Sequence, residues 1–211
     1  MIDPQAKPGP YIRLLALVVV LGLLSALLTF AFMALVSVGT GAIWEQAAQA
    51  LGLDTRLFTV LVCTIGGLLV GLLVKLFGDH NAIFAELMLE FGKTGRFNYR
   101  HAPGIVITAF VSLIAGGSLG PEAPLADACG GMGTLMADKL KLDERETRTM
   151  GFSGMSSMLA AFITSPFSGA ILGMESAQGG FSGLTMYFWV LFPSLLASAV
   201  AVVVFVLLSG T

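Results

Sequence analysis

Ten residues in the middle of the chain, GGSLGPEAPL at 116–125, have the composition of an anion site built from backbone groups. Three glycines and two prolines interrupt any continuous helix, and the flanks Ile105–Ala115 and Leu125–Met136 are each too short to cross a membrane. Gly120 can be the N-cap and Pro121 the first residue of a new helix, because the missing proline N–H costs nothing there. Free backbone N–H groups would then face a cavity, with the positive end of a helix dipole behind them, and would bind a small anion without a buried cation. The predicted anion-binding residues are Gly117, Ser118, Leu119, Gly120 and Pro121.

A second segment, TSPFSG at 164–169, has the same arrangement. Ser165 as N-cap and Pro166 as first helical residue would start a helix inside a 26-residue uncharged run, 149–174. Broken helices at membrane depth are tolerated where they line protein or a cavity, and they are pointers to a transport site. Two such breaks predict a re-entrant architecture, with Ser165 as a secondary site residue.

Acidic residues accompany both breaks. Glu122 would lie at the second position of the new half-helix, where the dipole favours its charged form, and it is the candidate gate or proton acceptor. A helix-start carboxylate bonded to local N–H groups is the alternative interpretation. Glu175 ends the helix that follows Ser165 and is a second candidate, although a structural hydrogen bond is favoured for it and for Asp127.

The composition places this chain in a membrane. Hydrophobic residues make up 56% of its 211 residues and charged residues 11%, against about 25% in soluble domains. A soluble globular enzyme is therefore nearly excluded, and a net charge of −2 gives no electrostatic case for nucleic acid. The two cysteines, Cys63 and Cys129, can form neither a disulfide framework nor a zinc site, so we predict no metal and no cofactor.

The uncharged runs predict an all-α integral membrane protein, a multi-span bundle with broken half-helices forming one transmembrane domain over residues 1–211. Lys7 and Arg13 precede the first run, the next loop holds only Arg56, and the following polar segment is basic again. This alternation places the N-terminus in the cytoplasm and the protein in the plasma (inner) membrane. The chain stops at the end of a hydrophobic helix, which predicts a half or a fragment. Expected helices cover 12–38, 57–77, 82–91, 103–117, 121–138, 149–163, 166–176 and 184–209.

At the two breaks the chain resembles the CLC family of chloride channels and proton/chloride antiporters. GGSLGPEAPLADACGGMG is similar to the family's G-[RK]-E-G-P segment with its glycine-rich half-helix, and GFSGMSSMLAAFITSPFSGAILGMES to the segment that ends in a Glu pair. The SLGPE-x-P pattern looks like a divergent bacterial ion-channel branch. The resemblance covers the first of the two inverted repeats of a CLC subunit, and it implies a chloride-type channel or transporter, or its N-terminal half.

Departures from the family pattern favour passive conduction over proton coupling. Aligned on Gly-Pro, the family's gating glutamate falls on Leu119, three residues before Glu122. Aligned on Pro166, the Glu pair becomes Glu175 and Ser176. The family's first anion motif falls near 78–82, where Asp79 would repel an anion, so Asp79 is only a secondary candidate.

Two other functions compete with this interpretation. One is a non-transporting membrane scaffold or folding fragment that needs a second half. The other is a rhomboid-like intramembrane protease, because GFSG at 151–154 matches G-x-S-G, but the required histidine should follow Ser153, whereas His80 and His101 precede it. The expected partners are a small inorganic anion such as chloride, the lipid bilayer, and a second copy or a second-half chain that meets residues 166–209. The basic loop 93–100 is a plain cytoplasmic loop or a contact to lipid headgroups.

Overall fold

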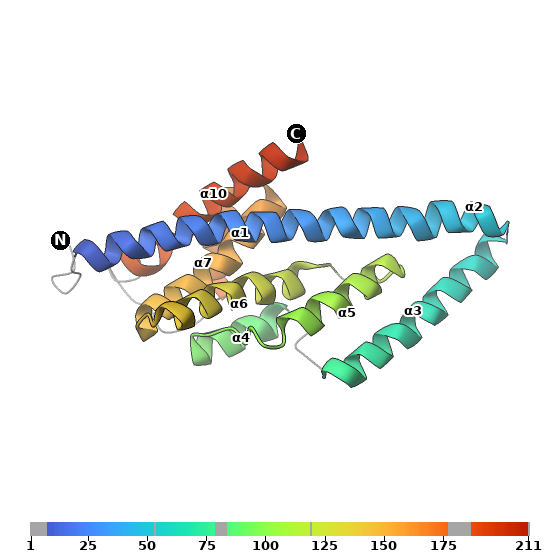
Figure 1. Ribbon diagram of the computed structural model, residues 1–211, viewed down its shortest axis with the longest axis horizontal. Helices are drawn as coiled ribbons and strands as arrows, with labels where there is room; N and C mark the ends of the chain where they lie inside the picture. The colour runs from blue at the N-terminus through green and yellow to red at the C-terminus, as the bar shows by residue number, and fades with distance from the viewer. Residues whose placement is uncertain (1–7, 53, 79–83, 119, 177–186, 211) are drawn as a thin grey trace.

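The protein is helical throughout the part that the structure describes. This computed structural model describes residues 8–52, 54–78, 84–118, 120–176 and 187–210, with the side chains of 8, 172–176 and 187 left aside. Helix α1 (Pro8–Gly41) runs along the length of the molecule and continues through a π-helical segment, η1 (Ala42–Ala47), into α2 (Ala48–Leu51) (Figure 1). Gly52, with φ +57°, then reverses the chain into α3 (Thr55–Phe77).

The middle of the chain is built from shorter helices below α1 in the same view. These are α4 (Phe84–Thr94), α5 (Ala102–Ile114) and α6 (Glu122–Leu140), and α5 is separated from α6 by the first break (Figure 1). At 13 residues, α5 is about 20 Å long, so it cannot cross a hydrocarbon core of about 30 Å. The predicted half-helix is therefore confirmed.

The last third of the chain packs against α1 and α6. It contains α7 (Glu144–Ile163), α8 (Pro166–Ser176), the π-helical turn η2 (Tyr187–Leu191) and α10 (Phe192–Ser209). Small residues let these helices approach closely: a Cβ at Gly22 of α1 would overlap the Ala197 carbonyl oxygen of α10, and one at Gly154 would overlap that of Cys129. The buried apolar core between α6 and α7 includes Leu125 and Phe152.

Several helix boundaries differ from expectation by a few residues, as where α5 ends at Ile114 rather than 117, and two differ by more. The first helix was expected to end near 38 but continues through η1 to Leu51. Helix α7 begins at Glu144 rather than 149, because Asp143 and Glu146 form a capping box in which each side chain accepts from the other's backbone N–H.

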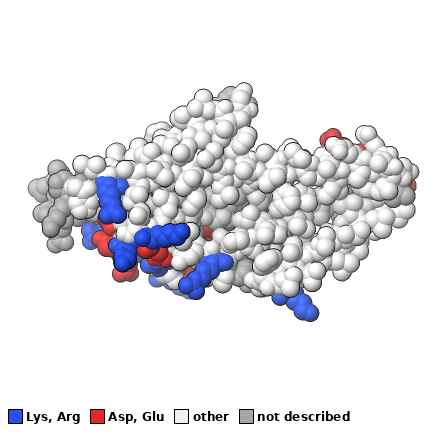
Figure 2. Space-filling view, viewed as in Figure 1, with Lys and Arg blue, Asp and Glu red and all other residues white. Residues whose placement is uncertain are grey.

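Three helical segments of the described part are long and apolar enough to span a bilayer: Gly9–Leu51, Thr55–Phe77 and Phe188–Ser209. On the face shown in Figure 2, most charged side chains gather along the lower edge, toward the end where α1 begins, and the upper middle of the view is uncharged. Together with the many exposed aliphatic side chains of α3, such as Leu68 and Leu76, this distribution is that of an integral membrane protein.

Candidate functional site

The first break starts with a backbone motif that ends α5. Gly116 has φ +96°, its N–H donates to the Leu113 carbonyl (3.1 Å), and the Gly117 N–H donates to the Ser112 carbonyl (2.8 Å). These are the two hydrogen bonds of a Schellman motif, and its left-handed position favours glycine. The Gly117 N–H is therefore already bonded. This corrects the prediction that all N–H groups from Gly117 to Gly120 are free.

Helix α6 starts on the other side of the break. Pro121 (φ −79°, ψ 5°) is its N-cap and Glu122 its first residue, whereas we expected Gly120 as N-cap and Pro121 as first residue. Pro121 has no polar side-chain atom, so no side chain caps the helix from that position. Its carbonyl accepts from the Leu125 N–H (3.0 Å), and Pro124 has no N–H at all. The positive end of α6 thus faces the break without a capping side chain.

The carboxylate of Glu122 folds back over Gly120. A Cβ added at Gly120 would overlap both carboxylate oxygens, so the acid lies directly against the backbone of the predicted anion segment. Pro121 is buried, Glu122 and Gly120 are partly buried, and Ser118 is exposed. A negative group already sits where backbone groups and a helix dipole favour one.

A small cavity of about 230 Å³ lies beside the break. Its walls come from α3 and from the end of α5, and Cys63 Sγ lies 3.8 Å from the Ala115 carbonyl oxygen. Within the described part of the chain it has no charged side chain. The lining residues are Cys63, Gly66, Gly67, Val70, Ser112, Ala115, Gly116 and Gly117.

The second break is a tight turn of two residues between α7 and α8. Thr164 has φ +56°, the Ser165 N–H donates to the Ala160 carbonyl (3.0 Å), and α8 begins at Pro166 as expected. No hydrogen bond among the described residues joins Ser165 to 116–121. Leu119 and Asp79 lie outside the described residues. Glu175 is in α8, but its side chain also lies outside them.

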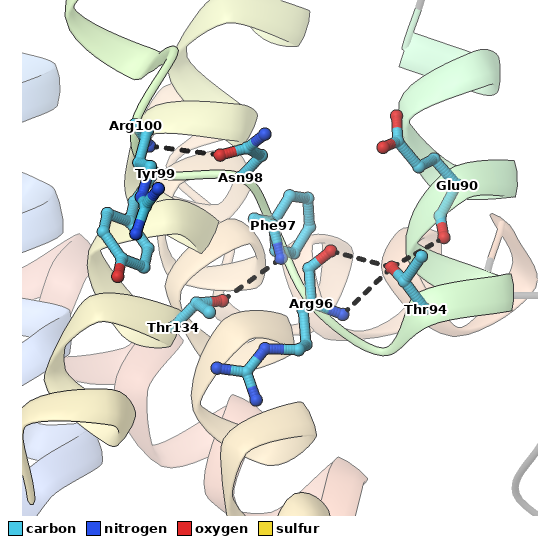
Figure 3. A pocket seen from close by; sticks show the side chains of 8 residues that line it. All are labelled: Glu90, Thr94, Arg96, Phe97, Asn98, Tyr99, Arg100 and Thr134. Carbon is cyan, nitrogen blue, oxygen red and sulfur yellow. Dashed lines mark hydrogen bonds between the residues drawn. The ribbon is translucent and has the colours of Figure 1, made fainter.

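The loop between α4 and α5, residues 95–101, leads into α5. This loop borders a cavity of about 300 Å³ (Figure 3). The Thr134 hydroxyl of α6 accepts from the Phe97 N–H (3.2 Å), and Phe97 stacks on Phe91 with ring centroids 4.6 Å apart. Arg96 forms an ion pair with Asp138. These contacts fix the start of α5, and so the direction in which its C-terminal end approaches the break.

The protease arrangement does not form in the described residues. Ser153 is fully buried in α7, and its hydroxyl has no hydrogen-bond partner there. His101 is exposed, with its ring Nδ1 3.4 Å from the Asn98 amide nitrogen, and His80 lies outside the described residues. No group of three or more His, Cys, Asp or Glu side chains that could hold a metal occurs in the described part.

The sequence pattern does not indicate Trp44, a residue far along the chain whose side chain contacts the end of α5. The Trp44 Nε1–H of η1 donates to the Ile114 carbonyl (2.9 Å), 70 residues away in sequence. No local pattern around Trp44 indicates this contact. A tryptophan just beyond the first apolar helix, close to the acid Glu45, is more typical of a membrane-interface residue.

Half-helices within a bundle of longer apolar helices, with a break at a helix N-terminus that its N-cap side chain does not cap, are typical of helical membrane proteins of the channel and transporter type. The family described as voltage gated chloride channel matches residues 66–211. The chain belongs to this family, which confirms the resemblance seen in the sequence.

Known relatives are longer than this chain. Proteins named "Putative ion-transport protein YfeO" from Escherichia coli (strain K12 / DH10B) and Shigella flexneri serotype 5b (strain 8401) are each 23% identical over 183 residues, covering 85% of this chain and 42% of the relative. The crystal structure of a slow cyanobacterial Cl−/H+ antiporter matches with a TM-score of 0.79 and 21% sequence identity. That match covers 98% of this chain and 48% of the other, and it shows a shared fold. The chain thus spans about half the length of the proteins it resembles.

Proposed function

We propose that this chain forms a transmembrane anion pathway of the chloride type, or the N-terminal half of one, with the anion held at the break between α5 and α6. The observation that carries the proposal is the Glu122 carboxylate folded over Gly120, at an α6 N-terminus that no side chain of Pro121 caps. A helix N-terminus stabilises a nearby negative charge. A small anion that displaced the carboxylate would meet the same backbone.

Glu122 then acts as the gate of this pathway. In its charged form the carboxylate competes with the anion for the N-terminal end of α6. In its neutral form it no longer competes, and the anion can bind there. Leu119, which the resemblance aligns with the family's gating glutamate, can neither compete as a charge nor carry a proton. We therefore propose passive conduction, with the backbone of Ser118 and Gly120 as the contact to the anion and Glu175 as a further proton candidate.

The test is chloride efflux from liposomes that contain the purified chain, followed with a chloride electrode at several pH values. Glu122→Gln removes the competing charge, so flux should rise and lose its dependence on pH. An increase of about tenfold would correspond to about 1.4 kcal/mol, the scale of one charge-assisted hydrogen bond. Leu119→Glu should introduce a pH-dependent block.

Glu144→Gln is the matched control. Glu144 is the first residue of α7, as Glu122 is of α6, but it is exposed at the charged end of the molecule. It should leave flux unchanged. If Glu122→Gln lowers the yield of folded protein without altering flux per folded chain, Glu122 is a helix-start residue only. If no variant supports flux, even with a second-half chain present, the scaffold interpretation replaces this one.

Completion of the pathway requires a second copy or a second-half chain. The share of related proteins that the chain covers, 48% of the antiporter and 42% of the ion-transport relatives, supports this part of the proposal. The exposed apolar side chains of α8 and α10, such as Phe167, Phe192 and Leu207, are the proposed contact surface within 166–209. Cysteine crosslinking in membranes between positions 167 and 207 should give dimers, and only monomer would contradict the assembly.

We also propose that the N-terminus is cytoplasmic in the plasma membrane. Arg145 of α7 lies over the Trp189 ring (5.3 Å), and this ring contacts Tyr11 near the start of α1 (5.4 Å), so basic residues gather where α1 begins. Short loops rich in Lys and Arg stay on the cytoplasmic side. A reporter fused ahead of residue 1 that is active only on the outer side of the membrane should stay silent, and activity would contradict the orientation.

A further inference from the structure

Trp44 lies where the long N-terminal helix changes its winding. The α-helical bonding of α1 gives way at Ala42 to the π-helical segment η1, and α2 resumes at Ala48. In a π-helical turn each N–H bonds to the carbonyl five residues earlier instead of four, so the side chains are rotated relative to the preceding helix, and such turns are frequent at functional sites. The half-buried indole of Trp44 projects from this segment toward the first break.

The indole N–H of Trp44 bonds to the last carbonyl of α5. The last four carbonyls of a helix have no partner in the regular helical ladder. In α5, the carbonyls of 111–113 accept from backbone N–H groups of 115–117. The fourth carbonyl, that of Ile114, accepts from Trp44 Nε1 at 2.9 Å.

The same ring also packs on the turn itself. A Cβ at Gly116 would lie 2.9 Å from Trp44 Cζ2, so the ring covers the glycine with φ +96°. Trp44 and Phe58 form an edge-to-face pair with centroids 6.0 Å apart, and Phe58 is buried at the start of α3. One side chain therefore joins η1, α3 and the end of α5.

We propose that Trp44 is a positioning residue for the anion site: its indole N–H holds the end of α5 and thereby fixes the backbone of Gly116 and Gly117 at the break. This inference rests on the proposed function, because it takes the break to be the place where the anion binds. Without the indole N–H, the carbonyl of the partly buried Ile114 lacks its hydrogen-bond partner, which is unfavourable. The turn can then move, and with it the wall of the 230 Å³ cavity.

The chain contains a native reporter of this cavity. Cys63 lines it and is exposed, with its Sγ 3.8 Å from the Ala115 carbonyl oxygen, whereas Cys129 is fully buried in α6. N-ethylmaleimide, a small uncharged thiol reagent, should therefore modify Cys63 first. Its rate reports how the end of α5 lies against α3.

Three variants separate the hydrogen bond from the ring. Trp44→Phe keeps an aromatic ring but removes the N–H. Trp44→His places its Nε2 where Nε1 of tryptophan was, because both atoms occupy the same position of a five-membered ring attached at Cγ. Trp189→Phe is the matched control at the other end of the molecule, where the ring contacts Tyr11 and Arg145.

The experiment measures maleimide labelling of Cys63 in the full chain in detergent micelles, with the ratio of chloride to nitrate flux in liposomes as a second readout. Trp44→Phe should speed labelling about fivefold, the equivalent of about 1 kcal/mol for one net hydrogen bond, and should change the flux ratio. Trp44→His should return both readouts toward the wild-type values. Trp189→Phe should leave both unchanged even if it lowers the melting temperature.

Labelling of Trp44→Phe at the wild-type rate would overturn the proposal, as would a histidine variant that behaves like the phenylalanine variant. If Trp44→Phe does not fold, hydrogen exchange of the unsubstituted chain decides: the amides of 115–117 should be protected as strongly as those of α5, and free exchange would overturn the proposal. Absence of flux in the wild-type chain counts against the proposed function alone, whereas unchanged labelling counts against Trp44 alone.

Discussion

The break at 115–121 and the break at 164–165 both join a helix to one that starts at or just after a proline, yet they differ in shape. Seven residues separate α5 from α6, and two separate α7 from α8. Both links begin with a Schellman motif, because the N–H groups of Thr164 and Ser165 donate to the Ala161 and Ala160 carbonyls as those of Gly116 and Gly117 do at the end of α5. The longer link has the cavity of about 230 Å³ beside it. The shorter link folds α8 directly onto α7, where a Cβ at Gly169 would overlap the Ser156 carbonyl oxygen.

The two breaks also use different residues in the left-handed conformation. Gly116 has this conformation without steric cost, whereas Thr164 has it despite a β-branched side chain. A strained residue persists where surrounding contacts fix it, and here the α7–α8 packing does so. The comparison shows that glycine and proline mark the position of a break, while link length and packing decide its shape.

The largest expected effect tests the packing at the second break. Gly169→Val should destabilise the chain by about 3 kcal/mol, because a side chain there meets the backbone of α7, with the Ala160 nitrogen 2.8 Å from the Cβ position. The measurement is thermal unfolding in detergent. Gly67→Val is the control, since nothing lies within 4 Å of its Cβ position. Equal losses in both variants would show that α8 is not held by this contact.

Substitutions of the two left-handed residues, Gly116 and Thr164, should change the stability of the chain in opposite directions. Gly116→Ala should cost about 2 kcal/mol, because it adds a Cβ at φ +96° that lies 2.9 Å from Trp44 Cζ2. Thr164→Gly should stabilise the chain by about 0.5 kcal/mol, since relief of left-handed strain exceeds the added chain entropy. Denaturant titration measures the free energy of unfolding of both variants. Loss of stability in Thr164→Gly would mean that its side chain contributes to the turn.

The smallest effect concerns the helix starts. Ser165→Ala should change stability by less than about 0.5 kcal/mol, because among the described residues no N–H of α8 donates to the Ser165 hydroxyl. Asp143→Ala should cost about 1 kcal/mol, since it removes the capping box of α7. A loss of 1 kcal/mol for Ser165→Ala would restore the predicted role of Ser165 as an N-cap.

Both breaks could be located from sequence because their causes are local. A proline cannot continue a helix interior, and a Gly-Gly pair offers the left-handed residue that ends one, so the helix ends near 115 and 163 follow from residue type. The start of α7 also has a local cause, since Asp143 and Glu146 have capping-box spacing, although the uncharged run alone predicts a start at 149. Membrane class and family follow from composition and from the motifs at the breaks.

What the sequence by itself determined is the membrane-embedded helical class, the two interruptions and the family resemblance, because apolar length, glycine and proline act within a few residues. Only the tertiary structure decided that the Gly117 N–H is used inside the α5 end, that Glu122 folds over Gly120, and that Trp44 closes the helix from 70 residues away. The physical reason is that hydrogen bonds and van der Waals contacts act over a few ångströms in space. Which distant segments come within that range is fixed by the packing of α1, α3 and α5 together.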